Sequence, residues 1–414
     1  MKRVLMVITL VALLLGPSFV VTAQEPVTLP EPTGPYAVGR MTLYFADETR
    51  PETLTDDPDD VRELMLYVWY PADPDPAAAA ATWLDPDLAA GVAAMFGLDA
   101  AVLDQIKVHA LQDVPVAAEQ PSYPVLIMSH GGRNSHPIFY TAYAEELASQ
   151  GYVVVGITHT YNALVTVLPD ERVLTMLPDA DPLVSELPAD APVYDQLSEA
   201  WERARRILEV TTADALAVLD YLTELNTSDP LFAGRLDLEK IGMFGHSFGG
   251  ATTVEAMARD TRIKAGVNLD GSLWSYYPDG VPGALLFVNE EGSDVSQPIP
   301  MPAEDEIDVA GLTPEQAEEL LAEFNAAYSA YTHTATAYSV TITGAAHLNF
   351  GDSGLLAAVF PDMADDLGPI DPAQALRITN DYLLAFFGAT LRGEASDLLT
   401  ATPYSDVRLD FHTP

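Results

Sequence analysis

A single serine stands between glycines in Gly245-His246-Ser247-Phe248-Gly249, directly after the apolar run 241–244. A serine hydroxyl is a poor nucleophile unless a sharp turn exposes it and a neighbouring base takes its proton. Such a turn is so tight that the residues two before and two after the serine must be nearly free of side chains. Both are glycine here, so the segment predicts a strand, a nucleophile elbow at Ser247 and a helix.

Histidine is the side chain that takes a serine proton near neutral pH, and the chain has eight histidines. Where such an elbow occurs, the base follows the acid in chain order and lies after the last strand. His333 precedes the apolar run 338–342, and His412 lies near the chain end. His347 follows that run in a loop whose small residues let it fold over the serine, so His347 is the predicted general base.

The third group must be a carboxylate that fixes the imidazole tautomer and stabilises its cation. Asp270 ends the apolar run 263–269 and is followed by glycine. A looser acidic cluster follows the next run, at Glu290, Glu291 and Asp294. The order of the strands leaves both positions open. A single acid directly at a strand end favours Asp270, and Asp294 is the alternative.

An oxyanion hole needs two backbone N–H groups, one directly after the nucleophile and one from the loop after an earlier strand. Phe248 supplies the first. Segment 129–133 is expected to supply the second, because its glycines let the backbone approach a substrate, and Gly132 is the predicted donor. His130 either contacts a ligand or has a structural role beneath this loop. His246 is expected to pack or to orient, since its side chain points away from the nucleophile.

Short apolar runs recur along the chain, as expected of strands that are buried on both faces of a parallel sheet. They are 124–129, 152–157, 241–244, 263–269, 283–288 and, more alternating, 338–342. Helix-length segments alternate with them: 138–149, 194–225, 248–259 and 372–391. This alternation predicts an open, doubly wound α/β sheet. Two earlier runs, 39–45 and 63–70, predict an antiparallel pair at its start.

The N-terminal residues 1–23 have the pattern of a signal peptide, with two basic residues, an apolar run and small residues before a cleavage expected after Ala23. An uncleaved membrane anchor is the alternative, although Gly16-Pro17-Ser18 interrupts the run short of the ~20 residues that span a bilayer. The proline-rich residues 24–35 predict an extended leader, and 36–414 a single domain.

Composition limits the possible chemistry and partners. The chain has 414 residues and no cysteine, which excludes disulfides, a thiol nucleophile and thiolate metal sites. The net charge is −42, and becomes −44 without Lys2 and Arg3 of the signal segment. This charge argues against nucleic acid and anionic membranes as partners. After cleavage we expect no stable membrane insertion.

Three insertions are expected to border the catalytic face, near 74–120, 161–195 and 295–332. The last contains a helix signalled by Thr313, which can cap, and by Gln316, which can complete a capping box. Its apolar stripe comprises Leu320, Leu321, Phe324 and Ala327, which predicts either packing on the body of the protein or part of a lid. Trp274 and Tyr276, which follow the Asp270 loop, are the candidate substrate-binding residues.

Taken together, these motifs resemble the platelet-activating-factor acetylhydrolase branch of the α/β-hydrolases. The resemblance rests on Ser-His-Gly at 129–131, Gly-His-Ser-Phe-Gly-Gly at 245–250, Leu-Asp at 269–270 and a glycine-preceded His347 followed by Leu-Asn-Phe. It covers roughly residues 120–352 and implies an α/β-hydrolase fold, with Asp270 as the acid. It also implies calcium-independent hydrolysis of esters, including phospholipids with short or oxidised acyl chains.

The sequence thus predicts a secreted, extracellular or periplasmic serine esterase that acts through an acyl-enzyme and needs no metal or organic cofactor. Its expected partner is a small-molecule or lipid ester. A cutinase-like polyester hydrolase or lipase is the alternative within enzymes, because the elbow is also similar to theirs. A catalytically silent binding protein on the same fold is the alternative of another class.

Overall fold

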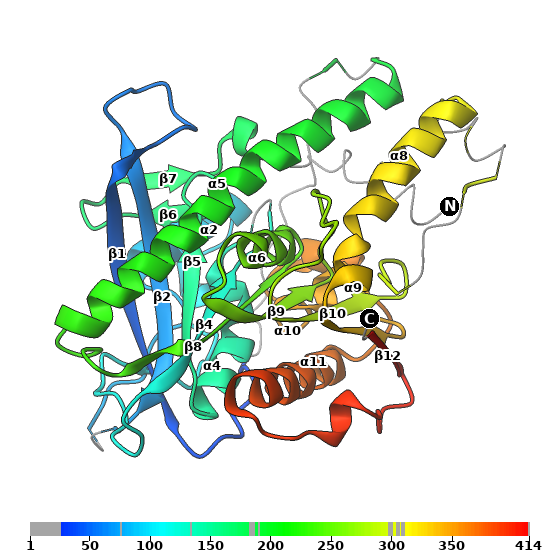
Figure 1. The fold of residues 1–414 in the computed structure, drawn as a ribbon. Coiled ribbons are helices and arrows are strands. Elements are labelled where there is room, and N and C mark those ends of the chain that lie inside the picture. The colour runs from blue at the N-terminus through cyan, green and yellow to red at the C-terminus, as the bar shows by residue number, and fades with distance from the viewer. Residues whose placement is uncertain are drawn as a thin grey trace.

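The computed structural model describes residues 26–74, 77–132, 135–181, 187–188, 191–296, 301–303, 307 and 311–412. The expected signal peptide and its cleavage point lie outside these residues. Within them, a central sheet has the strand order β12-β11-β10-β9-β8-β4-β5-β2-β1-β3. Figure 1 shows this sheet crossing the molecule with helices on both sides.

The strands between β5 and β11 all run parallel, and antiparallel pairs flank them. Their bounds are β4 Tyr123–Ser129, β5 Val153–Thr158, β8 Leu236–His246, β9 Ile263–Leu269, β10 Ala284–Glu290 and β11 Thr336–Ile342. Each overlaps a predicted apolar run, although β8 extends well beyond the predicted 241–244. The mostly parallel α/β sheet is therefore confirmed. The carboxyl ends of its parallel strands bring Ser247 and Asp270 to the same end of the sheet.

An antiparallel pair opens the chain, as expected, with β1 Ala37–Pro51 against β2 Val61–Ala72. Side chains alternate along β2 between two buried clusters, because successive residues of a strand point to opposite faces. Met65, Tyr67 and Trp69 pack into one cluster, and Leu64, Leu66 and Val68 into the other. The protein accordingly has a separate hydrophobic core on each face of the sheet.

Helices cover both of these faces. Helices α5 (Val193–Ser228) and α6 (Phe248–Arg259) contribute to one core, and α4 (Thr141–Ser149) and α11 (Pro372–Phe387) to the other. Figure 1 shows α5 crossing the sheet diagonally, with α6 beside it and α11 on the far side. Helix α6 starts directly after the predicted nucleophile, so the elbow lies between a buried strand and a buried helix.

Smaller elements fill the insertions. The first holds α2 (Pro86–Phe96), α3 (Ala100–Leu103) and β3 (Leu111–Gln112), and the second holds the hairpin of β6 (Val165–Val167) and β7 (Val173–Thr175). The third holds α8 (Pro314–Ala327), which is followed by α9 (Ser329–His333). Thr313 caps α8 with the predicted capping box. No helix within the described residues is long and apolar enough to cross a membrane.

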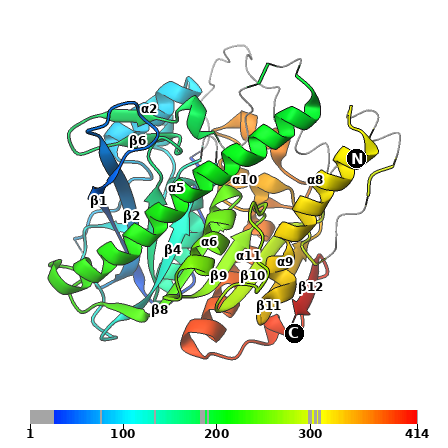
Figure 2. The same cartoon turned by 45° about the horizontal axis from the view of Figure 1, so that its top comes forward.

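Helix α8 packs on the N-terminal part of α5, and both project together beyond the sheet in Figures 1 and 2. The Phe324 ring lies 4.6 Å from the Trp201 ring, and the Tyr194 hydroxyl donates to Glu319 at 2.8 Å. The apolar stripe of α8 is thus covered from α5. The side chain of Ala327, which was expected in this stripe, lies outside the described part.

Two segments, one near each end of the chain, are part of the folded body. Residues 26–35 are extended but fixed to the body, since Leu29 is buried and Thr33 donates to Glu146 at 2.6 Å. Near the C-terminus, β12 (Val407–His412) adds an antiparallel strand to β11, which the sequence analysis did not predict. Its charged Arg408 and Asp410 obscure the apolar pattern because β12 lies at a sheet edge.

Candidate active site

Ser247 occupies the turn between β8 and α6 with φ 55° and ψ −121°. A positive φ in a residue with a side chain costs about 1–3 kcal/mol and persists only where its surroundings enforce it. The Ser247 N–H donates to the Leu269 carbonyl at 2.8 Å, and the Gly250 N–H donates to the Ser247 carbonyl at 2.9 Å. These bonds hold the strained turn, which raises the hydroxyl above the end of the sheet.

The glycines on either side of Ser247 are required by close packing. A Cβ atom at Gly245 would overlap the backbone of Gly249, and one at Gly249 would overlap the carbonyl of Ser129. The turn therefore accepts no side chain at either position. This is the steric reason that the sequence pattern anticipated.

Ser247, His347 and Asp270 form one continuous chain of hydrogen bonds. His347 Nε2 lies 2.9 Å from Ser247 Oγ, and His347 Nδ1 lies 2.7 Å from Asp270 Oδ2. An ionised carboxylate only accepts, so Nδ1 donates to Asp270 and leaves Nε2 of the neutral ring to accept from the serine. The three residues come from the ends of β8 and β9 and from the loop after β11.

Asp270 is fixed on its second oxygen as well. The Glu290 N–H donates to Oδ1 at 3.0 Å, the Ser293 hydroxyl donates to the same atom, and the Asp270 N–H donates to the Val288 carbonyl at 2.8 Å. Burial acts to raise the pKa of Asp270, but the bond and charge of His347 outweigh it together with the Ser293 and Glu290 donors. The pKa is therefore lowered, and Asp270 carries a negative charge.

The environment of His347 favours its cation. Burial acts to lower the pKa of this imidazole, but the hydrogen bond and charge of Asp270 outweigh burial, with smaller contributions from Glu290 and Asp366. The pKa of His347 is consequently raised above its ordinary value. A base in this position readily takes a proton from a neighbouring hydroxyl.

The alternative acid, Asp294, is engaged elsewhere. It is buried and pairs with Arg408 of β12. It also accepts from the Ser296 N–H at 2.9 Å and from the Ser339 hydroxyl at 3.3 Å. In this structure the hydrogen-bond partner of His347 is Asp270. Asp294 instead links the loop after β10 to β12 at the edge of the sheet.

The two predicted oxyanion donors lie in the expected segments. Phe248 is the first residue of α6, where a backbone N–H has no acceptor within the helix. The second segment passes beside the nucleophile: a Cβ at Gly131 would lie 3.4 Å from the Cβ of Ser247. Gly132, the predicted donor, follows directly and is half-buried.

His130 is buried beneath this loop, which supports the structural alternative for it. Its Nδ1 lies 2.6 Å from the Gly131 carbonyl, and its Nε2 accepts from the His159 N–H at 3.2 Å. Burial and the neighbouring His159 hold the pKa of His130 well below its ordinary value, so the ring is neutral and Nδ1 donates. The carbonyl of the Gly131–Gly132 peptide is thus drawn toward His130, and the N–H of this trans peptide points the opposite way.

A buried ionic cluster stands behind His130, and the sequence analysis missed it. Arg62 Nη2 pairs with Asp214 at 2.7 Å, and Arg62 Nη1 pairs with Glu52 at 2.6 Å. His159 joins Asp214 at 2.8 Å through Nδ1 and Ser129 Oγ at 2.9 Å through Nε2. The one sequence signal is an acid, Asp214, on the apolar face of a long helix; its partners are distant in sequence.

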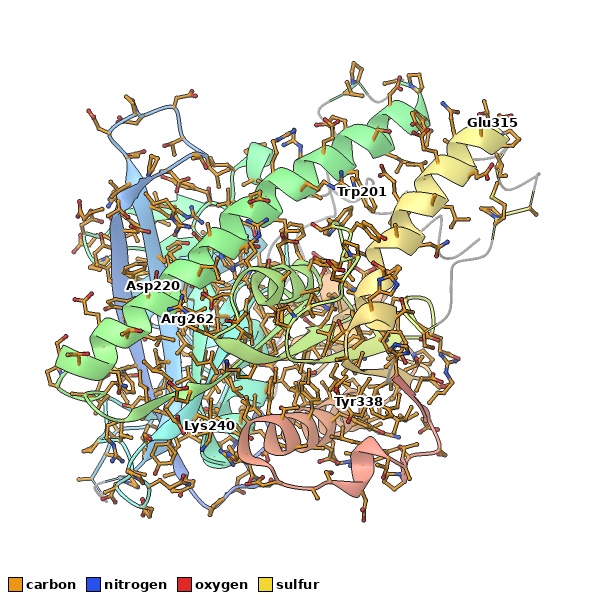
Figure 3. All side chains as sticks on the ribbon, viewed as in Figure 1. Trp201, Asp220, Lys240, Arg262, Glu315 and Tyr338 are labelled. Carbon is orange, nitrogen blue, oxygen red and sulfur yellow. The ribbon has the colours of Figure 1, made fainter. Side chains whose placement is uncertain are left out.

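The candidate substrate-binding residues differ in their surroundings. Trp274 is buried in an aromatic cluster with Trp201, Phe248 and Phe324, and its ring lies 4.8 Å from that of Trp201. Figure 3 shows Trp201 on the side of α5 that faces α8. Tyr276 is 59% exposed. Trp274 is therefore buried in the same cluster as Phe248, whereas Tyr276 lies at the surface.

Comparison with known protein families gives a match to the family described as platelet-activating factor acetylhydrolase, isoform II, over residues 21–180 and 218–397. The chain is 23% identical over 304 residues to the platelet-activating factor acetylhydrolase of Cavia porcellus, covering 66% of this chain and 62% of that protein. It is 27% identical to a probable 1-alkyl-2-acetylglycerophosphocholine esterase of Arthroderma benhamiae, covering 59% of each. The matches to both relatives thus span less than two thirds of their lengths.

A solved structure also resembles the whole chain. The ferulic acid esterase from Streptomyces cinnamoneus superposes with a TM-score of 0.67 at 25% sequence identity. The match covers 93% of this chain and 99% of that one. Together with the sheet order and the strand-elbow-helix unit, this likeness confirms the α/β-hydrolase fold.

Proposed function

We propose that this chain, which belongs to the family described as platelet-activating factor acetylhydrolase, isoform II, is a carboxylic ester hydrolase that acts through an acyl-enzyme. Ser247 is the nucleophile, His347 the general base and acid, and Asp270 the carboxylate that orients His347. The backbone N–H groups of Phe248 and Gly132 bind the oxyanion. No step requires a metal or an organic cofactor.

The reaction follows from the direction of the hydrogen bonds. His347 Nε2 takes the Ser247 proton as Oγ attacks the ester carbonyl, and the carbonyl electrons move to the oxygen that the two N–H groups bind. When the tetrahedral intermediate collapses, His347 returns the proton to the departing alkoxide. His347 then takes a proton from water as the water attacks the Ser247 ester, and returns this proton to Ser247 Oγ when the acid leaves. Asp270 stabilises the imidazolium throughout without itself taking a proton.

The hydrogen-bond chain from Ser247 Oγ through His347 to Asp270 is the observation that carries this proposal. A serine, a histidine and an aspartate with these distances, in the order of the fold, have the arrangement used for acyl transfer. The strained Ser247 backbone adds support, since strain of this kind gathers at functional sites. The names of the relatives and of the structural neighbour point to ester hydrolysis as well.

For the substrate, we propose esters with short acyl chains, including phospholipids with a short sn-2 chain. Names of the relatives refer to 1-alkyl-2-acetylglycerophosphocholine and to platelet-activating factor. Trp274, Trp201 and Phe248 pack in one cluster, and Phe324 of α8 packs against it. We infer that this packing leaves little room for a long acyl chain next to Phe248. Secretion after cleavage of residues 1–23 remains part of this proposal and is tested by N-terminal sequencing of exported protein.

Labelling with a fluorophosphonate probe tests the mechanism, because only an activated serine reacts rapidly. The wild-type chain is expected to label at Ser247, with hydrolysis of p-nitrophenyl acetate. Ser247→Ala is expected to abolish labelling and to lower kcat by about 10⁶. Near-native activity in folded Ser247→Ala would refute the assignment, and an unreactive wild-type chain would favour a silent binding protein.

An aromatic acyl ester is a second candidate substrate, which the Trp201, Trp274 and Phe324 cluster beside Phe248 favours. Such rings can stack on a cinnamoyl group, and the structural neighbour is named a ferulic acid esterase. Comparing kcat/KM for methyl ferulate and for 1-alkyl-2-acetylglycerophosphocholine distinguishes the two. Faster turnover of methyl ferulate would move the substrate assignment to aromatic acids.

A further inference from the structure

The Tyr140 hydroxyl connects parts of the candidate active site that are far apart in sequence. Tyr140 Oη lies 2.9 Å from His246 Nδ1, 3.3 Å from the Gly131 nitrogen and 3.1 Å from Ser135 Oγ. His246 Nε2 in turn lies 2.9 Å from the carbonyl oxygen of His347. Tyr140 and His246 are both buried, at 4% and 6% exposure.

The direction of these hydrogen bonds follows from what each group can do. The His347 carbonyl only accepts, so His246 Nε2 carries the proton and donates to it. Burial and the neighbouring His347 lower the pKa of His246 to about 3, so the ring is neutral and Nδ1 accepts. Tyr140 therefore donates to His246, and its oxygen accepts from the Gly131 N–H. The chain runs in one direction from the oxyanion loop to the backbone of His347.

The same region docks the His347 loop at further points. The Asp352 N–H donates to the Phe139 carbonyl at 2.7 Å, and the Asp352 carboxylate accepts from the Ala142 N–H. A Cβ at Gly351 would lie 3.1 Å from the Tyr140 ring, which shows how tightly the loop lies on this residue. These contacts hold the loop on the start of α4. The Tyr140 hydroxyl alone among them extends to His246 and Gly131.

We propose that Tyr140 and His246 are positioning residues that set the oxyanion loop and the general base in register with each other. This inference rests on the proposed acyl-transfer function and deepens it. Gly131 is held from both sides, through its N–H by Tyr140 and through its carbonyl by His130. Gly131 passes beside Ser247, so fixing Gly131 also restricts where Gly132, the next residue, can lie. His246, adjacent to Ser247 in the chain, holds His347 through its carbonyl.

Tyr140 and His246 are expected to affect the stability of the transition state more than the binding of substrate. The Gly132 N–H and His347 must be aligned with Ser247 when the oxyanion forms, whereas ground-state binding makes less demand on their register. Losing the link is therefore expected to lower kcat and to leave KM nearly unchanged. A residue that merely stabilises the fold would reduce the fraction of active enzyme, which also lowers apparent kcat at unchanged KM. The rate constant of fluorophosphonate labelling does not depend on the active fraction, so it falls only if the active site itself is less reactive.

The test uses Tyr140→Phe, His246→Gln and the double variant in the full chain. Tyr140→Phe keeps the ring and removes the hydroxyl, and His246→Gln keeps a side-chain N–H but loses the Nδ1 acceptor. Tyr70→Phe is the matched control. Tyr70 lies on β2, outside this network, and its buried hydroxyl donates to the Val114 carbonyl at 2.8 Å. Kinetics with p-nitrophenyl acetate and the rate of fluorophosphonate labelling are measured on protein shown to be folded by circular dichroism.

We expect Tyr140→Phe and His246→Gln each to lower kcat by roughly 10- to 100-fold, less than the ~10²–10³ of a lost oxyanion donor, with KM within about threefold. The double variant should fall no further than about the worse single variant, because both break one link. A wild-type kcat in Tyr140→Phe would overturn the inference, and so would a double variant whose loss of kcat is the full product of the two single losses. If Tyr140→Phe does not fold, a wild-type kcat in His246→Gln would overturn it. Ser247→Ala in the same assay separates the hypotheses, since activity there refutes the proposed function itself.

Discussion

At the scale of single residues, Ser247 and Asp270 share an unusual backbone conformation, with φ angles of 55° and 53°. Each directly follows a parallel strand, and each places its side chain above the sheet edge. Both backbones are held by neighbouring strands, Ser247 through Leu269 and Asp270 through Val288. The adjacent strands thus supply the energy that keeps both reacting groups in place.

The acid assignment predicts a clear ranking of two substitutions. Asp270→Asn is expected to lower kcat by about 10⁴, because an amide does not fix the imidazole tautomer. Asp294→Asn should leave kcat within a few fold, since Asp294 pairs with Arg408. Steady-state kinetics on both variants measures this, with circular dichroism as the control for folding. The reverse ranking would make Asp294 the acid.

The pH dependence of the reaction follows from His347. Its pKa is raised above the ordinary value of 6.5, and only the neutral ring can accept the Ser247 proton. The kcat/KM of the wild-type enzyme should therefore rise with pH through a limb above about 6.5. Replacing Asp270 by asparagine removes the main group that favours the cation, so the limb of the residual activity should move to lower pH. A limb at the same pH in both proteins would contradict this origin.

At the scale of elements, the buried cluster of Arg62, Asp214 and His159 joins β2, α5 and the segment after β5. Burial acts to raise the pKa of Asp214, but the charge and hydrogen bonds of Arg62 and His159 outweigh burial and lower it. Asp214 is thus a buried negative charge held by Arg62 and His159. Removing it leaves the buried Arg62 guanidinium with Glu52 as a carboxylate partner, and His159 without its acceptor.

A pair of substitutions in α5 tests this cluster. Asp214→Asn should reduce the free energy of unfolding by about 3–5 kcal/mol, because it leaves Arg62 buried and poorly paired. Asp220→Asn is the control on the same helix, where an exposed pair with Arg262 at 2.7 Å contributes at most about 1 kcal/mol. Figure 3 shows Asp220 and Arg262 on the surface. Urea unfolding measures both, and equal effects would show that the buried cluster has no special role.

The contact of α8 with α5 bears on acyl length. We expect p-nitrophenyl acetate and butyrate to be hydrolysed faster than the palmitate, and a polyester film to release little product. Phe324→Ala should raise the palmitate-to-acetate ratio by several fold, because it removes the ring that packs on Trp201. Leu320→Ala, on the same helix and in a different cluster, is the control. Faster palmitate or film hydrolysis by the wild type would instead favour the lipase or cutinase-like alternative.

The elements that the sequence predicts well are those that are almost fully buried. The run 263–269 coincides with β9, and the segment 248–259 coincides with α6, because few of their side chains face solvent: Lys264 in β9, and Ala258 and Arg259 at the end of α6. By contrast, β12 carries Arg408 and Asp410 at a sheet edge and was missed. The link from Tyr140 to His246 was also missed, because its two members lie 106 positions apart. His246, in the elbow motif, was expected to pack or to orient, but nothing in the sequence around Tyr140 marks it as the partner.

At the scale of the whole molecule, the net charge of −42 accompanies a fold in which several basic side chains are used in ion pairs. Arg62, Arg259 and Arg262, for example, each contact two carboxylates. The acidic excess therefore faces solvent and gives the surface a negative potential. Such a surface is repelled by anionic membranes and tolerates zwitterionic ones.

This charge predicts how the enzyme responds to lipid composition. Hydrolysis of 1-alkyl-2-acetylglycerophosphocholine should be slower in vesicles that contain phosphatidylglycerol than in pure phosphatidylcholine vesicles. The difference should shrink between about 0.01 M and 1 M salt, as the Debye length falls from ~30 Å to ~3 Å. A soluble p-nitrophenyl ester under the same salts is the control. Equal rates on both vesicles at low salt would contradict the prediction.

The hydrogen bonds that hold Asp270 bear on which segment of this fold can be exchanged. Ser293 and Glu290 hold the carboxylate, and Asp294 is anchored to Arg408 and Ser339 immediately before the third insertion begins. Near the end of this insertion, the Ser329 hydroxyl accepts from the Tyr277 N–H at 3.4 Å. The stretch between Asp294 and Ser329 is therefore anchored at both ends. We expect that exchanging this stretch would change the insertion near the proposed catalytic residues and leave the hydrogen bonds of Asp270 and His347 intact.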